Sequence, residues 1–225
     1  MQPAIHPRVK ICCISSVAEA RLAVAQGASA LGLVSSMPSG PGVIDEKIIA
    51  EIAASIPPAV SSFLLTSKQD ARSIITQQKK CRTNTVQLCD RIERKVYRQL
   101  RDSMPGIALV QVIHVIGREA IDEAIAVAPF VNAVLLDSGN PKASIKELGG
   151  TGRVHDWSIS KAIREILTIP VFLAGGLRPD NVGRAVADVG PFCLDVCSGV
   201  RTDGKLDEDK LSRFFEEIRS SSAKE

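Results

Sequence analysis

Short runs of apolar, often β-branched residues alternate along the chain with longer segments in which apolar residues recur every three or four positions. The short runs are typical of buried strands and the longer segments of amphipathic helices. We expect strands at residues 9–13, 30–34, 60–65, 85–88, 107–115, 133–136, 170–174 and 192–196. We expect helices at about 16–27, 45–55, 68–78, 91–103, 118–126, 158–166, 179–189 and 207–220.

Local signals support the first and last of these helices. Ser16 and Glu19 form an S-x-x-E capping box at the start of the first helix. Leu211, Phe214 and Ile218 recur at helical spacing in the last one, so they share one apolar face. Such a face is expected to pack on a sheet.

Strands that are apolar almost throughout and alternate with helices indicate a parallel sheet buried on both faces. Eight strand and helix pairs in 225 residues favour a single-domain (β/α)8 TIM barrel, with a doubly wound open sheet as the alternative. No linker divides the chain, so we expect one domain over residues 1–225. The longest connection runs from Asp137 to Trp157, and its position after a strand suggests that it covers a site.

Composition is that of a soluble globular protein, with 45% hydrophobic and 24% charged residues. A net charge of +3 with scattered Lys and Arg, and only 4% aromatic residues, give no support to nucleic-acid binding. No apolar run reaches the roughly 18 residues of a membrane span, and the first residues lack an apolar signal core. We therefore expect a cytoplasmic protein without a membrane partner.

The six cysteines show neither the spacing of a zinc site nor, at this chain length, that of a disulfide framework. We expect them to be reduced, and we expect no metal and no cofactor. Cys13 follows Cys12 directly and should point to the opposite face of the strand, toward the helices.

Chemistry in such barrels lies in the loops that follow the strands. A thiol, Cys12, follows the first strand and a carboxyl, Asp137, follows the sixth. Glycine-rich segments lie in the long connection and after the last two strands. The residues of these segments that we expect in the site are Gly152, Gly175, Gly176, Ser198 and Gly199. Backbone N–H groups approach phosphate oxygens closely where no Cβ intervenes, so these positions are typical of a phosphate site.

Each of these residues also has an ordinary structural role. A free cysteine such as Cys12 commonly packs as a small apolar side chain, and Asp137 could serve only a turn. Lys10 lies two residues before Cys12 on the same face of its strand, where an ammonium would lower the pKa of the thiol. In a closed barrel Lys10 would also form an ion pair with Asp195 on the last strand. Lys10 can lower the pKa of Cys12 and pair with Asp195 at the same time.

A series of short motifs, in order along the chain, resembles phosphoribosylanthranilate isomerase over about residues 8–218. The matching segments are Lys10-Ile-Cys12, Ala30-Leu-Gly32, Val86-Gln-Leu88, Leu135-Leu-Asp137, Gly149-Gly-Thr-Gly152, Asp156-Trp157, Leu173-Ala-Gly-Gly-Leu177, Pro179, Asn181-Val182, Asp195-Val196 and Ser198-Gly-Val200. This resemblance implies a barrel enzyme of tryptophan biosynthesis that uses no cofactor. Its partner would be a phosphorylated small molecule, and the protein would be a monomer or homodimer.

By that resemblance, Cys12 matches the general base and Asp137 the general acid of an Amadori rearrangement. Asp137 would protonate the furanose ring oxygen, and Cys12 would remove the C2 proton of the resulting Schiff base. A protonated carboxyl and a deprotonated thiol can coexist where their environments differ. The glycines and Ser198 named above match the loops that hold the phosphate.

The chain departs from the family pattern at four places. Cys13 stands where glycine usually follows the cysteine, and Cys89-Asp90 replaces a His-Gly pair. Arg201 stands where an acidic residue is common. In the family, a Ser-Pro-Arg-x-Val pattern supplies the arginine that receives the anthranilate carboxylate, and Pro41 occupies its position here.

An arginine–carboxylate pair is not easily replaced by a neutral residue. One interpretation is the same isomerase with Arg153 or Arg201 as the carboxylate partner. A second is an isomerase of another phosphorylated aminosugar, and a third is a barrel that binds a phosphorylated ligand or a partner protein without catalysis.

Overall fold

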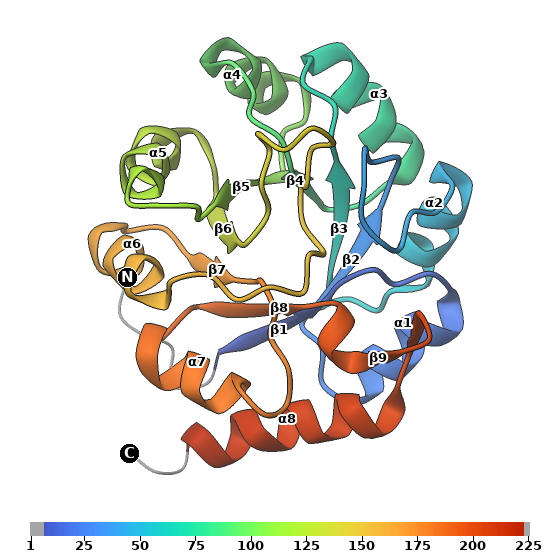
Figure 1. Cartoon of the computed structure of the whole chain (residues 1–225). Coiled ribbons are helices and arrows are strands. Elements are labelled where there is room, and N and C mark those ends of the chain that lie inside the picture. Colours follow the sequence, from blue (N-terminus) through green and yellow to red (C-terminus); the bar gives the residue numbers. More distant parts are fainter. Residues whose placement is uncertain (1–6, 223–225) are drawn as a thin grey trace.

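Eight parallel strands close into a barrel in the computed structural model, which describes residues 7–222 (Figure 1). The strands are β1 (Arg8–Ile11), β2 (Ala30–Val34), β3 (Ser61–Thr66), β4 (Thr85–Leu88), β5 (Ala108–His114), β6 (Ala133–Asp137), β7 (Val171–Leu173) and β8 (Cys193–Val196). The helices that surround them are α1 (Val17–Ala25), α2 (Glu46–Ser55), α3 (Ala71–Cys81), α4 (Arg94–Ser103), α5 (Glu119–Val127), α6 (Trp157–Ile166), α7 (Val182–Val189) and α8 (Glu208–Ser222). Shorter elements are the 3-10 turns η1 (Ala128–Phe130) and η2 (Ser198–Val200) and a small hairpin of β9 (Arg201–Thr202) and β10 (Lys205–Leu206).

Pairing of the first strand with the last closes the sheet. Lys10 of β1 lies opposite Asp195 of β8 on one side and opposite Ala30 of β2 on the other. The predicted (β/α)8 barrel is therefore confirmed, and the open-sheet alternative is wrong. The expected domain boundaries at residues 1 and 225 lie outside the described residues, so the single domain over 1–225 stays a prediction.

Element boundaries differ from the expected ones by a few residues. β1 ends at Ile11 rather than at residue 13, because Cys13 has a left-handed backbone with φ 61° and turns the chain out of the sheet. Helix α3 begins three residues later than expected, where the Asp70 side chain accepts a hydrogen bond from the Ser73 N–H at 2.9 Å. A capping side chain thus fixes this start more strictly than apolar spacing does.

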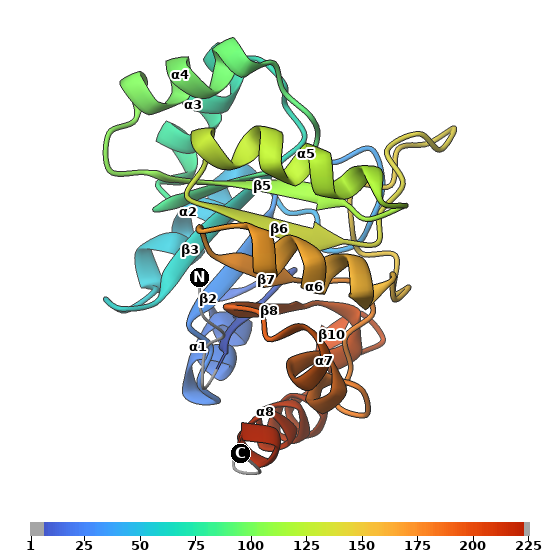
Figure 2. The ribbon, with the colours of Figure 1, turned by 90° about the vertical axis from the view of Figure 1, so that its left-hand side faces the viewer.

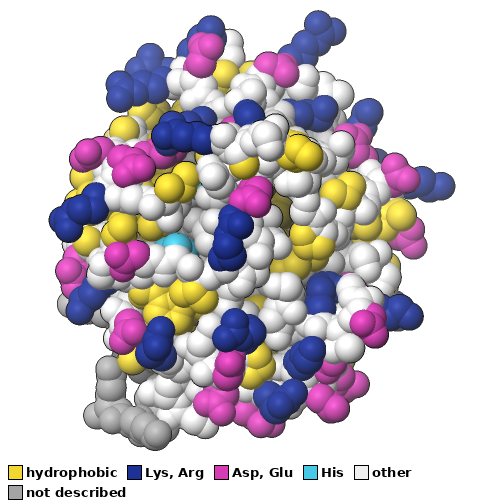
Figure 3. Space-filling model, viewed as in Figure 1, with side chains coloured by type: hydrophobic (Ala, Val, Ile, Leu, Met, Phe, Trp, Pro, Cys, Tyr) yellow, Lys and Arg dark blue, Asp and Glu magenta, His cyan; other side chains and the backbone are white. Residues whose placement is uncertain are grey.

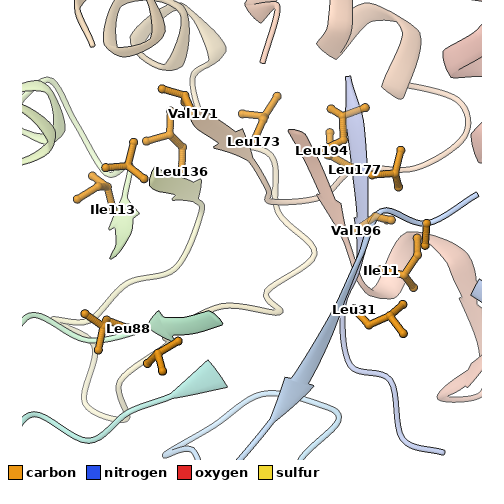
Figure 4. Packing of buried hydrophobic residues seen from close by; sticks show 14 of the residues in the cluster. Ile11, Leu31, Leu88, Ile113, Leu136, Val171, Leu173, Leu177, Leu194 and Val196 are labelled. Atoms are coloured by element: carbon orange, nitrogen blue, oxygen red, sulfur yellow. The ribbon is translucent and has the colours of Figure 1, made fainter. Parts of the chain in front are cut away.

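One apolar layer lies between the strands and the surrounding helices. Figure 4 shows side chains from successive strands pointing outward from the barrel into this layer. Labelled members are Ile11, Leu31, Leu88, Ile113, Leu136, Val171, Leu173, Leu194 and Val196. The predicted face of α8 joins it, since Leu211, Phe214 and Ile218 are buried. This layer attaches each helix to its strand by burial of apolar surface.

A second, smaller layer fills the inside of the barrel. Phe63 and Phe172 are its largest apolar side chains, with ring centroids 6.0 Å apart, and small residues such as Ala30 and Ala133 lie among them. Lys10 is also inside, and its ammonium lies 5.3 Å from the centre of the Phe63 ring. The interior is thus packed and carries one fully buried cation.

That cation is neutralised across the closing seam. Lys10 Nζ donates to both carboxylate oxygens of Asp195 at 2.9 Å, and the Lys10 side chain is 0% exposed. Although burial opposes the charge, the Asp195 carboxylate raises the pKa of Lys10 above its ordinary value. The sequence-based expectation of this ion pair is confirmed.

Substitution of Lys10→Met is expected to lower the free energy of unfolding by about 3–5 kcal/mol, because it leaves the Asp195 carboxylate buried without a partner. The double variant Lys10→Met/Asp195→Leu is expected to regain most of that loss, since apolar side chains can replace a buried pair. Urea unfolding followed by circular dichroism measures both. A single variant that loses less than about 1 kcal/mol, the worth of an exposed pair, would contradict this account.

Candidate active site

A cavity of about 710 Å³ opens at the end of the barrel toward which the strands point. In Figure 2 the arrowheads of β5 and β6 point to the side where the loop of residues 138–156 projects. The predicted site residues that line the cavity are Cys12, Asp137, Gly152, Gly175, Gly176 and Ser198. These six residues therefore share one cavity, whereas Gly199, which was predicted with them, is not among the lining residues.

Cys12 directly follows β1 in the cavity wall and is 7% exposed. A hydrogen bond from the Cys13 thiol is the main cause that lowers the pKa of Cys12, and it acts against burial, which raises it. The Lys10 ammonium lowers the pKa further. Room for both groups depends on Gly32, where a Cβ would lie 2.8 Å from the Cys12 sulfur and 3.0 Å from Lys10 Nζ. The environment therefore favours the thiolate form of Cys12.

Asp137 ends β6 and is buried in the opposite part of the wall. Its Oδ1 accepts a hydrogen bond from the Ser138 N–H at 2.8 Å, so it does serve the turn. Gly149 of the long loop closes over Oδ2, since a Cβ there would lie 2.9 Å from that oxygen. Burial raises the pKa of Asp137 above its ordinary value. The shifts of Asp137 and Cys12 run in the directions that a general acid and a general base require.

Glycine-lined loops form the part of the cavity beyond β7 and β8. Gly176 has φ 62°, and a Cβ on it would meet the Arg153 backbone at 2.7 Å. At Gly199, beside the lining residue Ser198, a Cβ would lie 1.9 Å from the Leu177 carbonyl oxygen. Exposed N–H groups on such glycine loops are suited to the oxygens of a phosphate.

The loop of residues 138–156 covers the cavity, as its length and position suggest. Figure 1 shows it crossing the end of the barrel. Lys146 Nζ lies 2.5 Å from Asp90 Oδ2, and the Lys146 carbonyl accepts from Ser39 Oγ at 2.7 Å. Gly150 packs against Pro41, where a Cβ would lie 2.6 Å from the proline ring. The loop is thus tied to the loops that follow β2 and β4.

Arg201, proposed from the sequence as a substrate partner, does not line the cavity. Its guanidinium pairs with Glu19, 2.9 Å from Nη1 to Oε1, and donates to the carbonyl oxygens of Cys12 at 3.3 Å and Cys13 at 2.6 Å. With its side chain only 7% exposed, Arg201 is occupied within the protein. That expectation needs correction, because Arg201 holds the backbone beneath the thiols instead.

Arg153 also lies outside the lining residues, but its side chain is 56% exposed on the covering loop. It forms an ion pair with Glu147 of the same loop. The lining residues, all within the described part of the chain, include no Lys or Arg. Pro41, at the position of the family's arginine, does line the cavity.

The expectation that Cys13 faces the helices is wrong. Its left-handed backbone turns the thiol into the cavity wall, 3.7 Å from the Pro41 carbonyl oxygen. Alternation of side chains holds only within a strand, and β1 has already ended.

Gln87 and Cys197 are among the other lining residues, and neither was expected in the site from the sequence. Gln87 is 3% exposed, and its Oε1 has no hydrogen-bond partner within residues 7–222. Its signals in the sequence are an amide between apolar neighbours and its place in the Val86-Gln-Leu88 motif. Cys197 directly follows β8, as Cys12 follows β1.

Figure 3 shows the face of the molecule that Figure 1 presents, with Lys, Arg, Asp and Glu interspersed over it. None of the helices in the described residues is long and apolar enough to cross a membrane. Within the same residues, no three His, Cys, Asp or Glu side chains are grouped to hold a metal ion.

Fold and cavity together define a (β/α)8 barrel in which a thiol and a carboxyl share one cavity with glycine-lined loops. The model of the family described as N-(5'-phosphoribosyl)anthranilate isomerase matches residues 9–217. The chain belongs to this family.

Individual relatives agree with the family match. The chain is 33% identical over 232 residues to an N-(5'-phosphoribosyl)anthranilate isomerase of Methanosarcina acetivorans, which covers 97% of this chain and 96% of the relative. It is 35% identical to isomerase 2 of Methanosarcina mazei, over 95% and 94% of the two chains. The solved phosphoribosylanthranilate isomerase of Thermotoga maritima superposes with a TM-score of 0.80 at 28% identity, covering 95% of this chain and 99% of that one.

Replacement of Cys13→Gly is expected to raise the pKa of Cys12, because it removes the thiol that hydrogen-bonds to the Cys12 thiolate. Glycine accepts the left-handed backbone, so the turn should survive. The pH dependence of Cys12 alkylation by iodoacetamide measures the shift. Cys13→Ser is the matched control, since its hydroxyl can still donate. An unchanged titration in Cys13→Gly would exclude this role of Cys13.

Proposed function

We infer that this barrel isomerises N-(5'-phosphoribosyl)anthranilate to 1-(2-carboxyphenylamino)-1-deoxyribulose 5-phosphate by an Amadori rearrangement. The observation that carries this inference is the pairing of Cys12 and Asp137 in one cavity with opposite pKa shifts. One solved isomerase with 27% identity and a TM-score of 0.77 is described as a complex with the reduced form of that product.

In the proposed reaction, protonated Asp137 donates its proton to the furanose ring oxygen. The ring C–O bond breaks, and the electron pair of the nitrogen forms the Schiff base at C1. The Cys12 thiolate then removes the C2 proton, which gives an enolamine that tautomerises to the ketone. Each proton transfer by a positioned group contributes about 10²–10⁴-fold to the rate.

For the phosphate we propose the loops of Gly152, Gly175, Gly176, Ser198 and Gly199. Within residues 7–222 the backbone N–H groups of Gly152 and Gly176 make no hydrogen bond, so they are free to donate. The exposed guanidinium of Arg153, whose backbone packs on Gly176, is the proposed cation at this end of the cavity.

The anthranilate carboxylate has no cation among the described lining residues. This observation favours a second candidate function, the isomerisation of another phosphorylated aminosugar without that carboxylate. The acid–base pair and the phosphate loops would serve either substrate. The two functions differ only at Pro41 and its surroundings.

We also propose a cytoplasmic location, supported by six cysteines that are all free. For the assembly we propose a monomer or homodimer. One solved relative, with 25% identity, is described as monomers of the dimeric isomerase from Thermotoga maritima.

Cys12→Ala and Asp137→Asn are each expected to reduce kcat by two or more orders of magnitude, because each removes one proton-transfer group. Steady-state kinetics with N-(5'-phosphoribosyl)anthranilate measures the loss. Cys81→Ala, at the end of α3 and outside the cavity, is the control for loss of a buried cysteine. Activity within threefold of the parent in either site variant would remove that residue from the mechanism.

The proposed roles of Cys12 and Asp137 also predict opposite effects of pH on kcat/KM. The Cys12 base must be deprotonated and the Asp137 acid protonated, so kcat/KM should rise with pH as Cys12 ionises and fall as Asp137 ionises. The residual activity of Asp137→Asn should lack the fall at high pH, and that of Cys12→Ala should lack the rise from low pH.

Pro41→Arg is expected to lower KM for N-(5'-phosphoribosyl)anthranilate by about one to two orders of magnitude with little change in kcat. A charged hydrogen bond contributes roughly 1.5–3 kcal/mol in ground and transition state alike. Arg153→Ala is measured alongside. An unchanged KM in Pro41→Arg together with a raised KM in Arg153→Ala would show that Arg153 already supplies the cation that binds the substrate. No activity in the parent or in Pro41→Arg, with phosphate binding intact, would favour the other aminosugar.

A further inference from the structure

Three thiols lie together at the seam where the barrel closes. Cys12 and Cys13 follow β1, and Cys197 follows the neighbouring strand β8. Ile11 is opposite Val196 in the strand pair, and the Cys12 N–H donates to the Val196 carbonyl at 2.8 Å. This register places the ends of β1 and β8 side by side. All three cysteines line the cavity.

Cys13 is the central member of this group. Interactions with the Cys12 and Cys197 thiols, together with burial, raise the pKa of Cys13 well above its ordinary value. Its φ of 61° is a conformation that costs a residue with a Cβ about 1–2 kcal/mol. Strain of this kind is retained where the surrounding structure enforces it, and it is common at functional sites.

Neighbouring groups hold this conformation. The Arg201 guanidinium donates to the carbonyl oxygens of Cys12 and Cys13, and Glu19 fixes Arg201 from the other side. Gly42 leaves the space that Cys13 occupies, since a Cβ there would lie 2.5 Å from the Cys13 Cβ. The Cys13 thiol is thus held between its two neighbours.

We propose that Cys13 and Cys197 are a resolving pair that returns Cys12 to its reduced form after reaction with a hydroperoxide. This chemistry lies beyond the isomerase reaction. A thiolate is the form of cysteine that a peroxide oxidises, and Cys12 is the cysteine whose surroundings favour it. Without a resolving thiol, further oxidation to the sulfinic acid is irreversible for most proteins.

The Cys12 thiolate attacks one oxygen of the hydroperoxide, so that an S–O bond forms, the O–O bond breaks and an alcohol or water leaves. Cys13 attacks the Cys12 sulfenic acid, which forms an S–S bond and releases water. Cys197 then attacks the Cys13 sulfur, leaving a Cys13–Cys197 disulfide and Cys12 as a thiol. Overall two thiols are oxidised and one peroxide is reduced.

Hydrogen peroxide is the probe. The reduced full-length chain is treated with it, free thiols are alkylated, and peptides are identified by mass spectrometry. We expect a Cys13–Cys197 disulfide with Cys12 alkylated as a free thiol, and full reversal by dithiothreitol. In Cys13→Ser we expect Cys12 to accumulate as sulfinic acid that dithiothreitol does not reverse. In Cys197→Ser we expect the oxidation to stop at a Cys12–Cys13 disulfide.

Cys81→Ser, whose cysteine is buried on α3 and outside the cavity, is the control and should behave as the parent. The proposal is overturned if Cys12 reaches the sulfinic acid as fast in the parent as in Cys13→Ser. It is also overturned if a Cys12–Cys13 disulfide persists in the parent while Cys197 stays free. Peptide masses report both outcomes whether or not the chain isomerises its proposed substrate.

Discussion

The buried ion pair between Lys10 and Asp195 is the interaction on which both the barrel and its cavity depend. It joins the first strand to the last inside the barrel, and Asp195 lines the cavity. A buried pair of this kind is no more stabilising than a good apolar contact, because removing both charges from water is costly. Its value here is electrostatic, since the ammonium also faces Cys12 and favours its thiolate. The same pair thus closes the fold and helps to lower the pKa of a thiol in the cavity wall.

The space that the Lys10–Asp195 pair needs restricts which residues can stand beside it. Gly32 of β2 cannot carry a side chain without meeting Lys10 and Cys12. Phe63 of β3 offers the face of its ring to the ammonium, a favourable contact for a cation without water. On the opposite wall the covering loop isolates Asp137 from solvent through Gly149. The Cys13 thiol and the Lys10 ammonium lower the pKa of Cys12, and burial raises that of Asp137, so the two groups can ionise in opposite senses within one cavity.

Much of this arrangement could be predicted because it depends on periodicity. Apolar runs report strands buried on both faces, and the strand-end rule then places Cys12 and Asp137 at one end of the barrel. Partners remote in the sequence were harder to foresee. Arg201 looked free to bind substrate because nothing in the sequence shows that Glu19, 182 positions earlier, would pair with it. Cys13 was misplaced because alternation stops where the strand stops.

Departures from the family pattern fall around the mouth of the cavity, and the structure connects several of them. Arg201 binds the carbonyl of Cys13, so the substituted turn after β1 and the cation after β8 stabilise each other. Asp90 pairs with Lys146 and ties down the covering loop, whose Gly150 in turn packs on Pro41. One of these departures also acts on Cys12, because the Cys13 thiol lowers the pKa of Cys12. The departures therefore lie in the loops around the mouth of the cavity, while Cys12 and Asp137 keep the strand-end positions that the barrel imposes.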